Sequence, residues 1–545
     1  MLCGRARIRV DAPRGAELTF EYFEVTDRTG NYCNTMIAPQ KDVYISNGSP
    51  CRYEAAFTFH GFRYLRVSGA DSVHKEDFTA VALSTEKENL GAFECSDPRL
   101  NRLYQNIRWS QRSNMLSIPT DCPSREKGGF TGDIQIYAKT AMLNEEMTPF
   151  LTGWLKNLKA AQAENGAVPI TVPETAPYRR LMAANAREFG DEPPVGVAGW
   201  SDAAVLVPYT MYRLTGNRRI LEEQYESMTH WCGYIIRTAE GRRGDSGLPH
   251  EVDSVLWNTG FHFGEWLIPS EEKGITQKEA CQRSAFYTAP IFGYLSVKCM
   301  AEIAEVLQKS EKAYYSRTAD QMKAAIQTAL ICDGELRSQN MGAYVLMIAF
   351  DLVPEHCKEH FAQKLISLLE SHHGCLDTGF LATPFLLDAF VKIGRRDLAI
   401  KLLWQTRMPS WLYEVEQGAT SVWESWDAIT PGSEPRITSY NHYAFGCVDA
   451  WIFENIAGIR ALEPGFRRVE IAPDLDGVPL EYCRRSFRCE YGDLLVFWDR
   501  QTLRISIPCG VRAVIRWHGA SHEVGSGEYT FTEPHRGGDQ NERTG

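Results

Sequence analysis

The chain has 545 residues, too many for one ordinary domain, and 44% of them are apolar, as expected for a globular protein. Its formal net charge of −11 is spread along the sequence, which argues against nucleic acid or an anionic membrane as the main partner. No apolar run approaches the roughly 18 residues that cross a bilayer, the first residues lack the apolar core of a signal peptide, and the 15 cysteines include no CxxC pair. We therefore expect a cytoplasmic protein with reduced thiols, and neither a cofactor nor a metal.

Residues 1–90 have the pattern of β structure. Short segments rich in Val, Ile, Tyr and Phe alternate with turn signals such as DRTGN and SNGSP; they are ARIRV, AELTFEYFEVT, DVYIS, YEAAFTFH, FRYLRVSG and EDFTAVALST. This spacing predicts an N-terminal β-sandwich domain over residues 1–90. Strand-like sequence begins almost at Met1, so the domain could be an abbreviated form of a larger one.

Residues 91–462 have a helical period. Asp97 and Pro98 form a helix start, followed by a run to about residue 115, and a further apolar run extends from about residue 134 to residue 158. Roughly a dozen such segments carry apolar residues at helical spacing. This number suits an (α/α)6 toroid as the catalytic domain. A helical solenoid is the alternative, but no fixed sequence period supports it.

From residue 463 to residue 545 the β pattern returns, in RRVEIAP, SFRCEYGDLLVFWDR, TLRISIP, AVIRWHG and GEYTFTE. It predicts a small C-terminal β-sandwich domain. The expected fold is therefore multidomain α and β, a central (α/α)6 toroid flanked by an N-terminal β-sandwich and a C-terminal β domain.

The segment SIPTDCPSREKGGFTGD, residues 117–133, combines Pro and Gly with charged side chains, which forbids a continuous helix or strand. A loop can direct Asp121, Glu126 and Asp133 into one small volume, with Arg125 holding one of them in place. Glycoside hydrolysis needs two carboxyl groups, one protonated and one charged, and clustered acids raise the pKa of one member. The alternative is a surface loop pinned by Arg–carboxylate bridges.

A second concentration of candidate residues lies at 409–446, where Trp423 and Trp426 flank Glu424 and His442 follows. Aromatic rings stack on the C–H faces of sugars, and acids bind the hydroxyl groups. The same Trp-rich segment could instead be packed core beside a helix start, and the residues alone do not decide between the two.

Two smaller motifs also pair a Trp with an acid. They are GWSD, with Trp200 and Asp202, and FHFGEWLIP, with Glu265 and Trp266. Taken singly, each favours a structural role. The pair His356 and His360 has helical i, i+4 spacing, but no third ligand is near, so an exposed polar face is favoured over a metal site.

Together these motifs resemble the α-L-rhamnosidases of glycoside hydrolase family 78, over nearly the whole chain. DCPSREKGGFTGD is similar to that family's DCPxREKxGWTGD, and GATSVWESWD is similar to its GATTxWExWD. GWSDAAVLVPYTMYRLTG, FTFHGFRYLRVSG, SYNHYAFG and LEPGFRRVEIAP also resemble family segments. The resemblance implies an inverting exo-α-L-rhamnosidase that removes terminal non-reducing rhamnose from a rhamnosylated small molecule or oligosaccharide.

The resemblance also implies a role for each matched residue. Glu126 matches the general acid and Glu424 the general base, about 6.5–9.5 Å apart in an inverting enzyme. Asp121 and Asp133 match acids that bind rhamnose hydroxyls, with Arg125 orienting them. The other residues expected to line the sugar site are Phe130, Trp200, Asp202, Glu265, Trp266, Trp423 and His442.

Three departures from the family pattern leave other functions open. Phe130 stands where the family usually has Trp, Glu265 stands where it usually has Asp, and the further upstream β domains of many members are missing. A related exo-glycosidase for another sugar and a non-catalytic carbohydrate-binding relative are therefore alternatives. A helical scaffold that binds protein leaves the clustering of acids and Trp unexplained. A homo-oligomer is possible.

Overall fold

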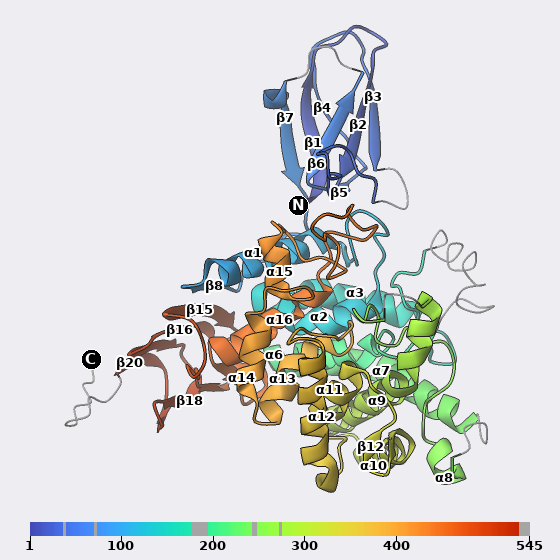
Figure 1. Cartoon of the computed structure of the whole chain (residues 1–545), viewed down its shortest axis with the longest axis vertical. Helices are drawn as coiled ribbons and strands as arrows, with labels where there is room; N and C mark the ends of the chain where they lie inside the picture. Colours follow the sequence, from blue (N-terminus) through green and yellow to red (C-terminus); the bar gives the residue numbers. More distant parts are fainter. Residues whose placement is uncertain (36–39, 70–73, 176–194, 242–247, 272–274, 533–545) are drawn as a thin grey trace. The chain divides into compact units, whose positions relative to one another are not determined.

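The computed structural model describes residues 1–35, 40–69, 74–175, 195–241, 248–271 and 275–532. It is a mixed α and β multidomain chain, with sheets near both ends of the sequence and helices between them (Figure 1). Packing divides it into two compact units. The first unit comprises Met1–Glu86, Arg102–Phe130 and Thr406–Gly446; the second comprises Lys87–Asn101, Thr131–Gln405 and Cys447–Gly545. These units cross the predicted domain boundaries, because two segments distant in sequence belong to the same unit as the N-terminal strands.

The first unit begins with two antiparallel sheets. Its strands are β1 (Leu2–Val10), β2 (Glu17–Phe23), β3 (Lys41–Ile45), β4 (Cys51–Glu54), β5 (His60–Phe62), β6 (Tyr64–Ser68) and β7 (Phe78–Ala82), with a 3-10 turn η1 (Lys75–Asp77). One sheet has the order β4-β1-β5 with β7 also paired to β1, and the other has the order β3-β2-β6. The predicted strand YEAAFTFH is interrupted, since β4 ends at Glu54 and β5 starts at His60.

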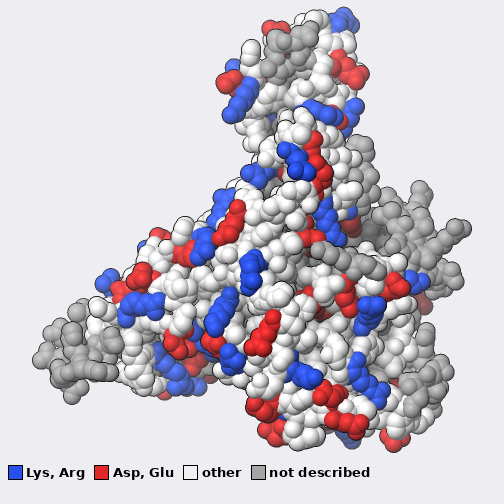
Figure 2. Space-filling model, viewed as in Figure 1, with Lys and Arg blue, Asp and Glu red and all other residues white. Residues whose placement is uncertain are grey.

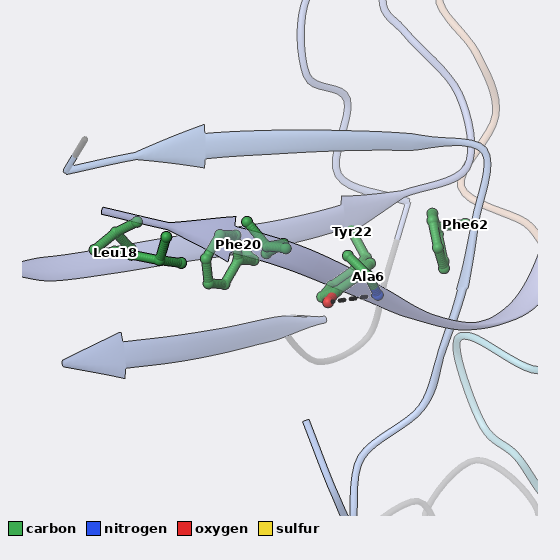
Figure 3. Packing of buried hydrophobic residues seen from close by; sticks show 7 residues of the cluster. Ala6, Leu18, Phe20, Tyr22 and Phe62 are labelled. Atoms are coloured by element: carbon green, nitrogen blue, oxygen red, sulfur yellow. Dashed lines mark hydrogen bonds between the residues drawn. The ribbon is translucent and has the colours of Figure 1, made fainter. Parts of the chain in front are cut away.

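The core of these sheets follows the two-residue period of a strand (Figure 3). It consists of Ala6, Ile8 and Val10 from β1, Leu18, Phe20 and Tyr22 from β2, and Phe62 from β5. The Tyr22 hydroxyl accepts the Ala6 N–H at 3.3 Å and donates to Asp42 Oδ2 at 3.1 Å, so its buried polar end is satisfied.

The rest of the first unit comes from two later segments. The predicted helix from Pro98 is confirmed as α1 (Pro98–Asn114), and from Arg102 onward it belongs to this unit. A short hairpin follows, β9 (Met115–Leu116) and β10 (Ile118–Pro119), turning at Ser117 with φ 66°. The later segment contains α15 (Trp411–Glu416) and the start of a 3-10 turn, η3 (Ala444–Cys447).

The second unit contains most of the helices, and its first pair corrects one prediction. The apolar run from residue 134 to residue 158 is two helices, α2 (Thr131–Asn144) and α3 (Thr148–Ala161). Pro149 is the reason: a proline is accepted in the first turn of a new helix but would break an ongoing one.

The other helices of the second unit are α6 (Ala203–Thr215), α7 (Arg218–Gly241), α8 (His250–Asp253), α9 (Gln277–Val306), α10 (Lys312–Leu330), α11 (Met341–Ala349), α12 (Lys358–Ser371), α13 (Thr383–Lys392), α14 (Arg396–Leu403) and α16 (Val448–Trp451). Shorter elements are β11 (Ile331–Cys332), β12 (Glu335–Leu336), the 3-10 turns η2 (Glu355–Cys357) and η5 (Pro464–Phe466), and the π-helical turn η4 (Ile452–Ile456). Among the helices described, none is long and apolar enough to cross a membrane.

The second unit ends in two further sheets. Their strands are β8 (Gly91–Cys95), β13 (Ile459–Ala461), β14 (Arg468–Ile471), β15 (Tyr482–Cys489), β16 (Gly492–Asp499), β17 (Thr502–Ile507), β18 (Arg512–Trp517), β19 (Ala520–Val524) and β20 (Gly527–Thr532). The sheet orders are β13-β14-β18-β19 and β20-β17-β16-β15-β8. Strand β8 was not predicted as part of the C-terminal sheet, because its pairing with β15 is a long-range contact.

A buried ion pair fixes β15 to the helices of the same unit. Arg485 and Asp449 are both fully buried, and Arg485 Nη1 donates to Asp449 Oδ1 at 2.9 Å. The Asn144 side chain donates to Asp449 Oδ2 at 3.0 Å, so that one carboxylate joins β15, α16 and α2.

On the coloured part of the face in Figure 2, acidic and basic side chains are interspersed without an extended patch of one sign.

Candidate active site

The loop after β10 is closed by the side chain and main chain of Asp121. The Asp121 N–H donates to the Gly128 carbonyl at 2.9 Å, and the Gly128 N–H donates to Asp121 Oδ1 at 2.8 Å. Lys127, between them, has φ 54°, so the chain reverses sharply at this point. The closed turn carries Glu126 at its tip with an exposed side chain, whereas Asp121 is buried.

The buried side chain of Cys122 supports the same turn. The Glu126 N–H donates to Cys122 Sγ at 3.3 Å. Burial, followed by the charges of Asp121 and Glu126, raises the pKa of the Cys122 thiol well above its ordinary value, so it stays protonated. A neutral thiol here fills space and accepts a main-chain hydrogen bond without adding charge to the loop.

Two cations of the loop bind main-chain carbonyls of the N-terminal segment. Arg125 Nη1 donates to the Thr35 carbonyl at 2.6 Å, and Lys127 Nζ donates to the Phe59 carbonyl at 2.6 Å while lying 4.4 Å from the centre of the Phe59 ring. Burial lowers the pKa of Lys127. These contacts anchor the turn on both sides of Glu126 within the first unit.

The candidate base Glu424 lies in a segment that pairs with residues 438–442. The Glu424 N–H donates to the Ser439 carbonyl at 3.0 Å, and the His442 N–H donates to the Val422 carbonyl at 2.8 Å. The Glu424 side chain is fixed by the same partner segment, because its Oε2 accepts the Ser439 N–H at 2.9 Å and the Thr438 hydroxyl at 3.1 Å. Both of these hydrogen bonds end on the same carboxylate oxygen.

The aromatic residues beside Glu424 are largely buried. Trp423 is 3% exposed, its main-chain N–H donates to Glu414 Oε2 at 3.2 Å, and its ring meets Tyr440 edge-on with centroids 5.8 Å apart. Trp426 is also 3% exposed and stacks on Phe445. Burial raises the pKa of Glu414 well above its ordinary value. Both indoles therefore belong to the core that supports the segment.

His442 is buried, and its Nδ1 accepts the Ala444 N–H at 3.3 Å. Since Nδ1 is the acceptor in this hydrogen bond, the neutral ring carries its proton on Nε2.

One acidic residue near these segments was missed by the sequence analysis. Glu24, directly after β2, is 2% exposed and hydrogen-bonds to Ser124 and to Tyr440. The available signal was the register of the strand: residues 18, 20 and 22 face the core, and position 24 continues that series with a charged side chain. A carboxyl in a core register is a stronger indication of a functional role than one on the polar face.

The predicted site residues are distributed over both units. The first unit contains Asp121, Arg125, Glu126, Phe130, Trp423, Glu424 and His442. The second unit contains Asp133, Trp200, Asp202, Glu265 and Trp266. The proposed acid and base thus belong to one compact unit.

The second unit brings its aromatic candidates together. Asp133 lies in the first turn of α2, and a Cβ on its neighbour Gly132 would lie 2.6 Å from the Trp200 indole, so only glycine fits there. The Trp200 ring contacts Phe263 with centroids 4.8 Å apart, and Phe263 contacts Trp266 at 5.4 Å. Phe263, which the sequence did not single out, thereby joins the two Trp segments.

Asp202 is fully buried and bonded to protein groups through both oxygens. Its Oδ2 accepts the Gly199 N–H at 2.7 Å, and its Oδ1 accepts the Trp231 Nε1–H at 3.0 Å and the Ser296 hydroxyl at 2.5 Å. Burial raises the pKa of Asp202. The side chain closes the turn that carries Trp200.

Glu265 is 3% exposed, and its Oε2 accepts the Gly379 N–H at 2.9 Å. Burial raises its pKa to about 8, so the group is a neutral carboxylic acid at pH 7 and can donate a hydrogen bond. A Cβ on Gly342 would lie 2.3 Å from Glu265 Oε2, so the absence of a side chain there makes room for the carboxyl group.

His262 ties the Glu265 segment to the Trp200 turn. Its Nδ1 accepts the Ala198 N–H at 3.0 Å, its Nε2 lies 3.0 Å from the Thr259 carbonyl, and burial lowers its pKa to about 4. Within the described ranges, no His, Cys, Asp or Glu residues are grouped as a metal site.

Sequence models of one family cover most of the chain. The bacterial alpha-L-rhamnosidase concanavalin-like domain matches residues 1–84, the 6 hairpin glycosidase domain matches residues 88–456, and the C-terminal domain matches residues 458–529. These models define a multidomain protein of glycosidase type. The chain belongs to the bacterial α-L-rhamnosidase family.

Known proteins agree with this assignment. The chain is 33% identical to an α-L-rhamnosidase of Streptomyces avermitilis over 97% of its own length and 51% of that protein, and 31% identical to one of Formosa agariphila over 91% and 52%. The chain thus spans about half the length of the curated relatives it matches.

Two solved structures show the same fold. The Streptomyces avermitilis α-L-rhamnosidase complexed with L-rhamnose is 32% identical with a TM-score of 0.86, over 98% of this chain and 51% of that one. The α-L-rhamnosidase of Aspergillus terreus is 30% identical with a TM-score of 0.87, over 98% and 61%.

Proposed function

We propose that this chain is an inverting exo-acting α-L-rhamnosidase that removes terminal non-reducing rhamnose from rhamnosylated small molecules or oligosaccharides. The names of its relatives support the substrate, as does the L-rhamnose in the solved Streptomyces avermitilis structure. The observation that carries the catalytic assignment is the pair Glu126 and Glu424, presented by two braced segments of one compact unit.

In this proposal Glu126 is the general acid. Its exposed carboxyl group, at the tip of the turn closed by Asp121 and Gly128, gives a proton to the glycosidic oxygen as the C–O bond breaks. Glu424 is the general base. Because Ser439 and Thr438 hold its Oε2, Oε1 is the oxygen that takes a proton from the attacking water. Inversion requires about 6.5–9.5 Å between the two carboxyl groups, to leave room for that water.

For the remaining residues we propose sugar binding and support. In the first unit Asp121 binds hydroxyl groups; in the second unit Asp133 and the neutral Glu265 bind hydroxyl groups, and Trp200 and Trp266 provide ring faces. For Asp202 we propose a supporting role only, since its oxygens already accept hydrogen bonds from the protein. Phe130, Arg125, Trp423 and His442 complete the proposed set.

We also propose that the helical region of residues 91–462 has the (α/α)6 toroid arrangement, supported by the six-hairpin glycosidase model that matches it. We propose in addition that the protein acts in the cytoplasm. It is supported by the cysteines, since all 15 in the sequence are free thiols.

A panel of aryl glycosides tests the substrate. We expect release of the aryl group from the α-L-rhamnoside, with Glu126→Gln and Glu424→Gln each losing nearly all of it. Turnover of a different glycoside in preference would favour the related exo-glycosidase, for which Phe130 and Glu265 are the residues to exchange. Tight binding of rhamnose without turnover would instead favour the carbohydrate-binding relative.

A further inference from the structure

Glu24 lies between the two segments that carry the proposed acid and base. The Ser124 hydroxyl is 3.0 Å from Glu24 Oε1, and the Tyr440 N–H donates to Glu24 Oε2 at 3.4 Å. Glu24 itself follows β2 in the N-terminal sheets and is 2% exposed. One buried carboxyl group thus connects three separate stretches of the first unit.

Each of its partners is close to a proposed catalytic residue along the chain. Ser124 is within the turn that the Glu126 N–H closes on Cys122 Sγ. Tyr440 directly follows Ser439, whose N–H holds Glu424 Oε2 and whose carbonyl accepts the Glu424 N–H. If Glu24 were displaced, its partners Ser124 and Tyr440 would lose their contacts. Ser124 is two residues from Glu126, and Tyr440 is next to Ser439, which holds Glu424.

The surroundings of Glu24 favour its neutral form. Burial raises its pKa to about 8, the hydrogen bonds from Ser124 and Tyr440 and the charge of Arg125 oppose that rise, and the negative charge of Glu424 adds to it. Glu24 accepts the Ser124 hydroxyl with Oε1 and the Tyr440 N–H with Oε2. A glutamine can keep both contacts, because its oxygen accepts the Tyr440 N–H and its amide N–H donates to Ser124 Oγ, whereas an alanine can make neither.

We propose that Glu24 is a positioning residue, through which the N-terminal sheets fix the acid loop and the base segment in their working geometry. The expected effect of Glu24 on catalysis rests on the proposed function. Its effect on the structure of the acid loop and the base segment does not. It gives residues 1–86 a part in the chemistry, because the buried carboxyl group of these sheets sets the geometry of both proposed catalytic side chains.

Hydrogen exchange tests the structural part without any substrate. Peptides covering residues 120–128 and 436–442 are compared in the wild type, Glu24→Ala and Glu24→Gln. We expect the Glu126 and Tyr440 amides to exchange about tenfold faster or more in the alanine variant, since the closing contacts open locally, and near wild-type rates in the glutamine variant. Unchanged exchange in Glu24→Ala would overturn the inference.

The matched control is Glu21→Ala. Glu21 is an acid on β2, the strand that Glu24 follows, and its Oε2 accepts a hydrogen bond from Arg66 Nε at 2.7 Å. This variant should exchange like the wild type in both peptides. If Glu24→Ala does not fold, Ser124→Ala removes only the hydroxyl contact and should still accelerate exchange at Glu126; no acceleration there would also contradict the inference.

Turnover of an aryl α-L-rhamnoside tests the catalytic part. Misplaced catalytic groups lower kcat by about 10- to 100-fold, so we expect that loss in Glu24→Ala with KM within about threefold of the wild type, and recovery in Glu24→Gln. A glutamine variant no better than alanine would contradict positioning by hydrogen bonding. A wild type without turnover would refute the proposed function, while the exchange data would still decide the role of Glu24.

Discussion

The buried carboxyl group of Glu24 predicts a specific pH dependence of stability. Its pKa is raised from 4.5 to about 8 in the folded chain, chiefly by burial. Between these two values the folded chain holds a proton that the unfolded chain has released. The contribution of Glu24 to the free energy of unfolding is therefore fully present below pH 4.5 and is lost as the pH rises through about 8.

The size of this loss follows from the same shift. Between pH 5 and pH 8 it amounts to roughly 3.5 kcal/mol, on the order of 1.4 kcal/mol for each pH unit at which the folded and unfolded states differ by one proton. Glutamine keeps the shape of the protonated acid and does not titrate. Glu24→Gln should therefore lose roughly 3.5 kcal/mol less stability than the wild type between pH 5 and pH 8.

Urea unfolding at pH 5 and pH 8, followed by circular dichroism, measures this difference. Glu21→Gln, on the preceding strand β2, should behave like the wild type. Equal pH dependence in the wild type and Glu24→Gln would mean that Glu24 is ionised in the folded chain, and it would refute a buried neutral acid at this position.

Four other substitutions have definite expected outcomes. Glu126→Gln and Glu424→Gln should each lower kcat by about 100- to 10,000-fold, measured by release of an aryl group, because each removes one proton transfer. Gly132→Ala should displace the Trp200 indole, cost about 1–3 kcal/mol of stability and raise KM; unchanged tryptophan fluorescence and KM would argue against this packing. Arg485→Met should lower the free energy of unfolding by about 3–5 kcal/mol, since it leaves a buried carboxylate unpaired, and a loss below about 1 kcal/mol would contradict that account.

Local pattern predicted many of the elements and selected the candidate residues. The cap and proline at Asp97 and Pro98 predicted the start of α1, and short segments rich in Val, Ile, Tyr and Phe between turn signals predicted the strands β1 and β2. The charged, glycine-rich loop with Glu126 and the Trp-flanked Glu424 could be selected because their composition is unusual for a structural segment. These signals depend only on near neighbours in sequence.

Contacts between residues far apart in the sequence could not be predicted from local sequence patterns. Strand β8 completes a sheet whose other strands come from the far end of the chain, and no local feature of residues 91–95 indicates this. Glu24 was missed for a related reason: its meaning depends on Ser124 and Tyr440, which reach it only in the folded chain. Asp202 shows the converse: it was expected to line the sugar site through the family resemblance, whereas both of its oxygens accept hydrogen bonds from the protein.

The stereochemistry of the first product tests the central proposal most directly. Wild-type protein is mixed with an aryl α-L-rhamnoside in an NMR tube, and the anomeric proton of released rhamnose is followed before mutarotation equalises the anomers. A general acid at Glu126 and a general base at Glu424, acting on opposite faces of the ring, predict β-L-rhamnose as the first product. If α-L-rhamnose appears first, Glu424 does not act through water in a single displacement, and the proposed mechanism is wrong.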